Sequence, residues 1–376
     1  MAAVSALVTR SPRPSIIVLG GGIAGLTAAF RLASLDARVT VVEQGPLVRP
    51  DVDQPSDPFI VSQGHQATHD LWRALHPQTP FPTMVSLEFR LPGVRTIPYP
   101  YTPLPKPIHL AASILRFGGM TWRERFKLVS WLEQIWEGAI ERPSDLAHRS
   151  ADEWLASLGQ SHHTRRTIWD PFAQWLTGAP LTTLPSDVFW TTVEPLFCRS
   201  PHASRWAIAP SMHASLVQPM MDRLAMRGAT VLRDTAAMQL LGEGDQVTGV
   251  VLQNGSVMRG DWYLSAVPHR RLASLLPERW LSRYAYFQQL SELTDVPMMH
   301  LRATIRQSCV QPRIVLVSED PFYALVLHSD GPQDTVCNFY GRNPVTDRAH
   351  SRTQPQSQAE AVLRSLHLLS SDAKVD

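Results

Sequence analysis

Three glycines near the start of the chain have the spacing of a phosphate-binding turn. Gly20, Gly22 and Gly25 lie in the run GGGIAG, with Ile23 and Ala24 before the last of them, and fit the pattern G-x-G-x-x-G. In such a turn the first glycine permits a tight bend, the second lets the backbone approach a pyrophosphate, and the third lets a helix pack closely on a strand. Free amide groups at the helix N-terminus then favour an anion. The pattern predicts a dinucleotide site.

An acidic residue follows at the distance that such a site requires. Glu43 lies 18 residues after Gly25, at the end of a β-branched run. A carboxylate there can accept hydrogen bonds from a ribose diol, and it favours a free 2′-hydroxyl over a 2′-phosphate. The neighbouring Gln44 is a further candidate for the same site.

The elements that must position these residues form a βαβ unit. An apolar strand over 16–19, a helix over 26–35 rich in small residues, and a strand over 38–43 stand in the required order. The alternative, a glycine-rich turn that binds nothing, does not account for the strand, helix, second strand and acid all standing in register.

Composition limits the class of protein. The chain has 376 residues, 44% of them apolar, which is enough for two packed domains. Lys and Arg total 35 against 33 acids, so the charge gives no indication of nucleic acid as a partner.

The cysteines and the apolar runs favour a cytoplasmic protein. Cys198, Cys309 and Cys337 lie far apart without ligand spacing, so neither a disulfide framework nor a metal site is expected. The first 14 residues lack the apolar core of a signal peptide, and no run reaches the ~18 apolar residues of a membrane span.

The middle of the chain is expected to be mainly helical, after short strands over 59–61, 86–91 and 95–101 and a helix over 69–75. Thr121 and Glu124 form a capping box before a helix that continues to residue 140. Its apolar stripe predicts a face directed into the core. The alternative is an amphipathic helix on a lipid surface, because basic residues gather at its start. The apolar stripe consists of Trp122, Phe126, Val129, Leu132, Trp136 and Ile140. The basic residues are Arg116, Arg123, Arg125 and Lys127.

Further elements follow from local signals. Ser150 and Glu153 predict a second capping box, and a helix is expected over 165–176. From residue 228 the pattern becomes β, with strands over 230–232, 236–241, 246–252, 256–259 and 262–266 separated by hairpin turns, so a three-stranded meander lies between two further strands. A last helix is expected over 357–369.

The first βαβ unit, a long insertion and the returning segment 228–268 together resemble the flavin amine oxidase and phytoene desaturase superfamily. The resemblance implies FAD as the cofactor. It also implies that the backbone of Ala237 meets the adenine end and that Ala266 ends a strand beside the cofactor. The expected fold is α/β: a Rossmann-like FAD-binding domain with an inserted mixed helical and β substrate domain.

Several stretches are similar to the squalene-associated flavoproteins, the hydroxysqualene dehydroxylases of hopanoid biosynthesis: 61–65, 121–125, 150–159 and 169–172. This resemblance implies reductive dehydroxylation of hydroxysqualene to squalene. It also implies an apolar isoprenoid substrate, peripheral attachment to the inner face of a membrane, and contact with other squalene-pathway enzymes. Flavin chemistry needs few protein acids or bases, so no catalytic residue is predicted. The candidates for an aromatic cavity are Trp169, Phe172, Trp175, Phe189, Trp190 and Phe197. For each of them, simple packing in the core is an equally good alternative.

The chain departs from the superfamily pattern in two places. The usual Gly-Gly-Arg turn after the acid is missing, and only Arg49 could replace part of it. The C-terminal Gly-Asp motif that closes over the flavin is also missing, so a truncated C-terminal segment is expected. Three alternatives remain open: a carotenoid desaturase of the phytoene type, a truncated inactive remnant of such a flavoenzyme, and an amine or porphyrinogen oxidase.

The expected domains follow from the same resemblance. Residues 1–80 and 226–275 would form the FAD-binding domain, residues 81–225 the largely helical substrate domain, and residues 276–376 substrate-domain strands with a C-terminal helix.

Overall fold

The computed structural model divides the chain into two compact units, one of Met1–Ser56 with Ser211–Asp295 and one of Asp57–Pro210 with Val296–Asp376. The structure describes residues 13–45, 58–82, 84–92, 96–136, 146–209, 211–290, 292–305, 311–329, 334–342, 353–366 and 368. The second unit interrupts the first in the sequence, as expected for a nucleotide-binding domain with an insertion.

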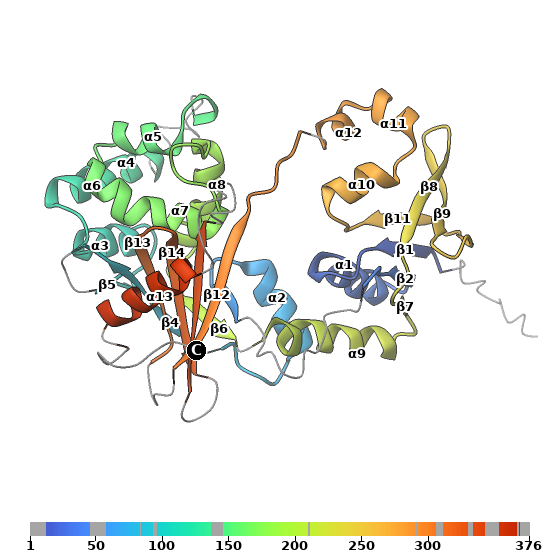
Figure 1. Ribbon diagram of the computed structural model, residues 1–376, viewed down its shortest axis with the longest axis horizontal. Helices are drawn as coiled ribbons and strands as arrows, with labels where there is room; N and C mark the ends of the chain where they lie inside the picture. The colour runs from blue at the N-terminus through green and yellow to red at the C-terminus, as the bar shows by residue number, and fades with distance from the viewer. Residues whose placement is uncertain are drawn as a thin grey trace, which may run out of the picture. The chain divides into compact units, whose positions relative to one another are not determined.

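The first unit contains a four-stranded parallel sheet in the order β11-β1-β2-β7. Its strands are β1 (Ser15–Leu19), β2 (Arg38–Val42), β7 (Thr230–Leu232) and β11 (Trp262–Ser265). Helix α1 (Ile23–Ser34) connects β1 to the parallel strand β2 and so completes the predicted βαβ unit (Figure 1). In β1 the run 16–19 is buried, and in β2 Val39, Val41 and Val42 are buried, which explains why these positions are apolar.

A smaller antiparallel sheet in the order β10-β9-β8 completes the β part of this unit. It is the predicted meander, formed by β8 (Ala237–Glu243), β9 (Gln246–Leu252) and β10 (Val257–Met258). The short helices α10 (His269–Leu275), α11 (Glu278–Arg283) and α12 (Ala285–Gln289) follow. Trp280 of α11 packs against Gly242 and donates a hydrogen bond from Nε1 to the Gly244 carbonyl at 3.0 Å. These helices therefore belong to the first unit.

The second unit is built on a sheet of eight strands, with β12-β15-β14-β13-β4-β6-β3 as its path and β5 paired to β4. These strands are β3 (Phe59–Ser62), β4 (Met84–Arg90), β5 (Thr96–Pro98), β6 (Trp206–Ala209), β12 (Met298–Ile305), β13 (Arg313–Glu319), β14 (Phe322–Ser329) and β15 (Thr335–Arg342). All described pairs are antiparallel except β13 with β4.

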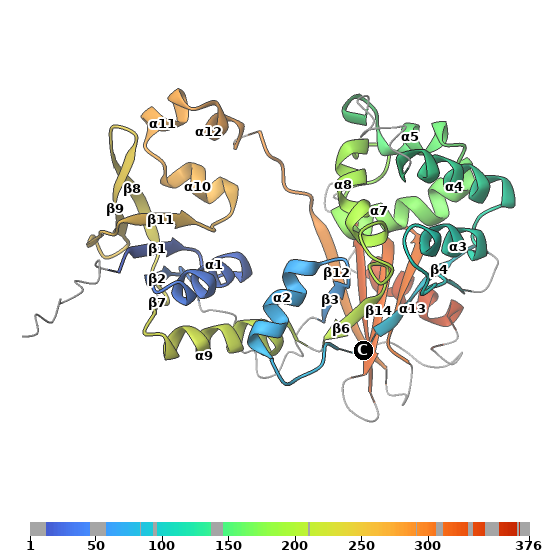
Figure 2. The same ribbon diagram turned by 180° about the vertical axis from the view of Figure 1, so that it is seen from behind.

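Helices cover both faces of this sheet. On β13 the side chains of Ile314 and Leu316 enter a core shared with the preceding helices, whereas Val315 and Val317 pack with α13 (Thr353–Ser365) on the opposite face. Figures 1 and 2 show α13 beside the strands and α4, α5, α7 and α8 gathered away from it. The elements of the helical layer are α3 (Ile108–Arg116), α4 (Trp122–Trp136), η1 (Leu146–His148), α5 (Ala151–Ser157), α6 (His162–Thr164), η2 (Arg165–Trp169), α7 (Asp170–Thr177) and α8 (Ser186–Phe197). Helix α2 (Gln66–Leu75) follows β3 and lies apart from this layer (Figures 1 and 2).

The observed boundaries differ from the expected ones at three places. Residues 58–80 join the second unit because β3 pairs with β6 in its sheet. Residues 211–225 join the first unit, because η3 (His213–Val217) and α9 (Gln218–Met226) pack on α1, where Thr27 Oγ1 donates to the Met220 sulfur at 3.7 Å. Residues 276–295 also belong to the first unit. Non-local packing, which the sequence does not show, sets all three.

The predicted orientation of α4 is wrong at its start. Trp122 and Phe126, which were expected to face the core, are 62% and 59% exposed, whereas Glu124 and Leu128 are buried. The Thr121 amide donates to Glu124 Oε2 at 2.8 Å and the Glu124 amide donates to Thr121 Oγ1 at 3.4 Å, as the capping box predicts. The Thr121 hydroxyl also donates to Oε2, at 2.6 Å. The Ser161 amide also donates to Oε1 at 2.8 Å, and this distant donor draws the carboxylate inward. The aromatic residues two positions away on either side of Glu124 consequently face outward.

Candidate dinucleotide site and apolar cavity

The turn between β1 and α1 requires glycine at two positions for steric reasons. Gly20 has φ +99°, and a Cβ there would lie 2.8 Å from the Ala266 carbonyl oxygen. A Cβ on Gly25 would lie 1.9 Å from the Gly20 carbonyl oxygen. These two glycines therefore hold the strand, the turn and the helix in close contact.

Gly22 differs from the other two glycines because the fold itself does not require it. Its φ is −67°, which any residue can adopt, and no atom lies within 4 Å of where its Cβ would stand. The position faces open space at the N-terminus of α1. Ile23 and Ala24 begin that helix, and the amides of a first helical turn have no acceptor within the helix. The space beside Gly22 is therefore suited to an anionic group.

Glu43 is held at the edge of the same space. Its Oε2 accepts a hydrogen bond from the Gly21 amide at 2.5 Å, and its Oε1 accepts one from the Gly45 amide at 2.8 Å. Both carboxylate oxygens are thereby oriented while each retains capacity for another donor. A ribose diol is the donor pair for which the sequence predicts this acid.

These groups surround a pocket of about 340 Å³ in the first unit. Of the residues predicted from the sequence, Gly20, Gly22, Glu43, Gln44, Ala237 and Ala266 line it. Ile23, Ala24 and Gly25 form the first turn of α1 and are not among its lining residues. Arg49 lies outside the described residues.

Arg271 is a lining residue that the sequence did not reveal. It lies on α10, and its Nη2 donates to the Ala237 carbonyl at 2.6 Å. This bond occupies one lone pair of the carbonyl at which the adenine end was expected, and it holds a cationic side chain at the wall of the pocket. Arg270 precedes it without lining the pocket. The packing of α10 against β8 distinguishes the two arginines, because it brings Arg271 to the Ala237 carbonyl.

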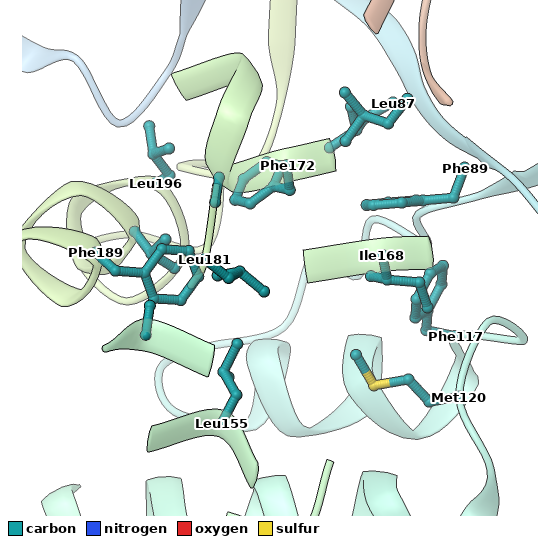
Figure 3. Close-up of a cluster of buried hydrophobic side chains, with 14 of the residues drawn as sticks. Leu87, Phe89, Phe117, Met120, Leu155, Ile168, Phe172, Leu181, Phe189 and Leu196 are labelled. Carbon is teal, nitrogen blue, oxygen red and sulfur yellow. The ribbon is translucent and has the colours of Figure 1, made fainter. Parts of the chain in front are cut away.

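The second unit contains a cavity of a different kind. It lies between α3, α4, α5, η2, α7 and α8 and has a volume of about 80 Å³. None of its described lining residues carries a charge, and the two with titratable groups, Tyr99 and Cys198, stay neutral because burial raises their pKa, that of Cys198 to about 12. In Figure 3, Phe89 approaches from β4 while Leu155, Ile168, Phe172 and Phe189 approach from the helices.

Five of the six aromatic residues predicted for such a cavity line it. These are Trp169, Phe172, Phe189, Trp190 and Phe197. The sixth, Trp175, instead packs against Trp206, with ring centroids 4.7 Å apart. Trp131 and Trp154, which the sequence did not single out, meet edge to face at 5.2 Å and extend the aromatic wall.

Two absences apply to the described part of the chain. No group of three or more His, Cys, Asp or Glu side chains there could hold a metal ion. No described helix is long and apolar enough to cross a membrane.

Comparison with known proteins agrees with the fold and the pocket. A family model described as an NAD(P)-binding Rossmann-like domain matches residues 18–70. The 15-cis-phytoene desaturase of Glycine max is 25% identical over 312 residues, which cover 77% of this chain and 54% of the desaturase. The 15-cis-phytoene desaturase of Synechococcus elongatus is 23% identical over 235 residues, which cover 60% of this chain and 49% of that protein. The chain thus spans about half the length of the curated relatives it matches.

A solved structure shares the fold along most of the chain. The structure of an oxidoreductase from Methanosarcina mazei superposes with a TM-score of 0.67 at 14% identity and covers 96% of this chain and 86% of its own. The fold and the site define a Rossmann-like α/β protein with a dinucleotide pocket. FAD fits the residues present, because Gly22 leaves room beside the helix N-terminus and Glu43 has acceptor capacity for a ribose.

Proposed function

We propose that the chain is a flavin-dependent oxidoreductase that acts on a long isoprenoid, with desaturation of a phytoene-type hydrocarbon as the leading reaction. The observation that carries this proposal is an uncharged, largely aromatic cavity in a chain that also has a dinucleotide pocket. The desaturase relatives support the choice of an isoprenoid substrate.

In this proposal the first unit holds the cofactor. The first turn of α1 would receive the pyrophosphate beside Gly22, and Glu43 would accept hydrogen bonds from the ribose hydroxyls. Bound FAD supplies the capacity to take up a hydride from the substrate. Arg271 would fix the Ala237 backbone at the adenosine end through its 2.6 Å hydrogen bond.

The second unit would hold part of the isoprenoid chain and exclude water. The cavity presents ring faces and methyl groups, and its neutral thiol and phenol stay protonated because they are buried. Its volume of about 80 Å³ is too small for an entire isoprenoid of thirty or more carbons, so the cavity would hold only part of the chain.

Reductive dehydroxylation of hydroxysqualene is the second candidate. The sequence stretches 61–65, 121–125, 150–159 and 169–172 favour it, because they are similar to the squalene-associated flavoproteins. Aromatic ring faces such as those of Trp169 and Trp190 would stabilise the cation formed when water leaves. Either substrate dissolves in lipid, so we also propose a cytoplasmic protein that attaches to a membrane surface. Other squalene-pathway enzymes would be partners only in the second case.

The test begins with the visible spectrum of the purified chain after gel filtration with added FAD. Flavin bands that remain with the protein are expected. The flavin-loaded protein is then incubated either with phytoene and an electron acceptor or with hydroxysqualene under reducing conditions, and the products are separated by chromatography. New conjugated double bonds support desaturation, and squalene supports dehydroxylation.

Two variants connect the outcome to the structure. Val193→Phe fills the cavity and should abolish conversion while flavin binding stays normal. Gly22→Val should abolish flavin binding while the unfolding temperature stays within a few degrees of the wild type. A chain that never retains flavin, or a Val193→Phe variant that converts substrate at the normal rate, would contradict the proposal.

A further inference from the structure

Helix α4 exposes an aromatic pair that the fold holds rigidly in place. Trp122 and Phe126 are 62% and 59% exposed, and their ring centroids lie 6.0 Å apart. The Arg125 guanidinium lies 4.7 Å from the centre of the Trp122 ring, while its Nε and Nη1 donate to the carbonyls of Met120 and Leu115, each at 2.8 Å. The tryptophan is therefore fixed on the surface. A large exposed apolar pair of this kind is typical of an interaction site.

Basic residues flank this pair along the chain. Residues 116–127 contain Arg116, Arg123, Arg125 and Lys127, and their one acid is Glu124. Arg116, Arg123 and Lys127 are exposed, whereas Glu124 is 4% exposed and its carboxylate is satisfied by internal donors. The surface therefore combines tryptophan and phenylalanine rings with a net positive charge. That combination matches the boundary between the headgroups and acyl chains of an anionic bilayer.

The opposite side of the same helix lines the apolar cavity. Leu128, Trp131 and Leu132 of α4 face the cavity, together with Phe117 and Met120 from the segment that precedes it. One helix thus separates the exposed aromatic pair from the space proposed for the isoprenoid. The internal bonds of Glu124 set this division, because they decide which side of α4 faces inward.

We propose that the surface formed by Trp122, Phe126, Arg123 and Lys127 docks on an anionic phospholipid bilayer, with α4 lying in the interface. This assignment deepens the proposed function, because a lipid-dissolved isoprenoid would reach the cavity past α4. The docking itself depends only on the surface. Lipid binding and substrate conversion can therefore succeed or fail separately.

The test is flotation of the full chain with vesicles of phosphatidylglycerol and phosphatidylcholine, compared with vesicles of phosphatidylcholine alone. The wild type is expected to float with the anionic vesicles and to be released at 0.5 M salt, because screening weakens the attraction of the basic residues. The double variant Trp122→Ser/Phe126→Ser should lower the vesicle-bound fraction at least tenfold. Arg123→Glu/Lys127→Glu should do the same on anionic vesicles.

The matched control is Trp262→Ser in the first unit. Trp262 is 67% exposed and lies on β11, outside the unit that contains α4, so its replacement removes an equally accessible indole without changing the proposed surface and should leave flotation unchanged. Thermal unfolding and flavin retention establish that each variant is folded. Flotation that is absent in the wild type, or equal in the wild type and the Trp122/Phe126 double variant, would overturn the proposal. So would a wild-type dimer in light scattering that this double variant converts to monomer, because the surface would then join two copies of the chain.

Discussion

Replacing Gly25 by alanine tests whether this glycine is required by the fold rather than by the cofactor. An alanine Cβ would lie 1.9 Å from the Gly20 carbonyl oxygen, about 1.1 Å closer than Cβ atoms approach other atoms in proteins. The obstacle is backbone in a tight turn, so no side chain can move aside. Overpacking of this kind costs ~1–3 kcal/mol, and the rigid neighbour places this case at about 3 kcal/mol. For a unit of this size the unfolding temperature should fall by roughly 6–12 °C.

Gly22→Ala is the matched control in the same turn. Its Cβ meets no atom within 4 Å and its φ of −67° is unstrained, so the stability should change by less than about 1 kcal/mol. The new methyl group would occupy space at the helix N-terminus, and FAD affinity should fall by roughly tenfold or more.

Thermal unfolding followed by circular dichroism and titration of flavin fluorescence measure the two effects. The expected pattern is an unstable Gly25→Ala variant and a stable Gly22→Ala variant that binds FAD weakly. A Gly25→Ala variant with the wild-type unfolding temperature, or a Gly22→Ala variant with normal FAD affinity, would refute the reasoning.

Four further predictions follow from single side chains. Glu43→Gln should weaken FAD binding about tenfold in the same titration. Both carboxylate oxygens accept backbone amides, and the side-chain NH₂ group that replaces one of them can accept neither its backbone amide nor a ribose hydroxyl. Burial would raise the pKa of Glu124, but hydrogen bonds from Thr121 and Ser161 lower it to about 2 from an ordinary 4.5. The ionised carboxylate therefore contributes fully to the free energy of unfolding above pH 4.5, and this contribution is lost as the pH falls toward 2. Denaturant unfolding at each pH should show the wild type losing on the order of 2–3 kcal/mol over this range, whereas Glu124→Gln should not show that loss. The Tyr323 hydroxyl is buried without a hydrogen-bond partner among the described residues, so Tyr323→Phe should leave the free energy of unfolding unchanged or raise it by ~1 kcal/mol. A decrease of more than ~1 kcal/mol would contradict this, because it would mean that the hydroxyl has a partner. Burial raises the pKa of Cys198 to about 12, so peptide mass spectrometry should find its alkylation by iodoacetamide at pH 8 at least a hundredfold slower than in the unfolded chain.

Local patterns were sufficient to predict the elements nearest the cofactor. The glycine turn, the strands on either side of α1 and the meander after residue 228 are where the sequence places them, because strand and turn propensities act over a few residues. The capping box at Ser150 and Glu153 is also present, with both of its hydrogen bonds. The aromatic cavity was predicted in composition, and five of its six proposed rings line it.

The sequence by itself determined the dinucleotide turn, its acid and the helical period of α4. The tertiary structure decided which side of α4 faces inward, since the Ser161 amide, 37 residues away, binds the Glu124 carboxylate. It also placed Arg271 on the pocket wall and moved residues 58–80 into the second unit through the pairing of β3 with β6. Spacing along the chain fixes the period of a helix or strand. Which segment a helix or strand packs against depends on hydrogen bonds and packing between distant parts of the chain, and no local pattern contains these.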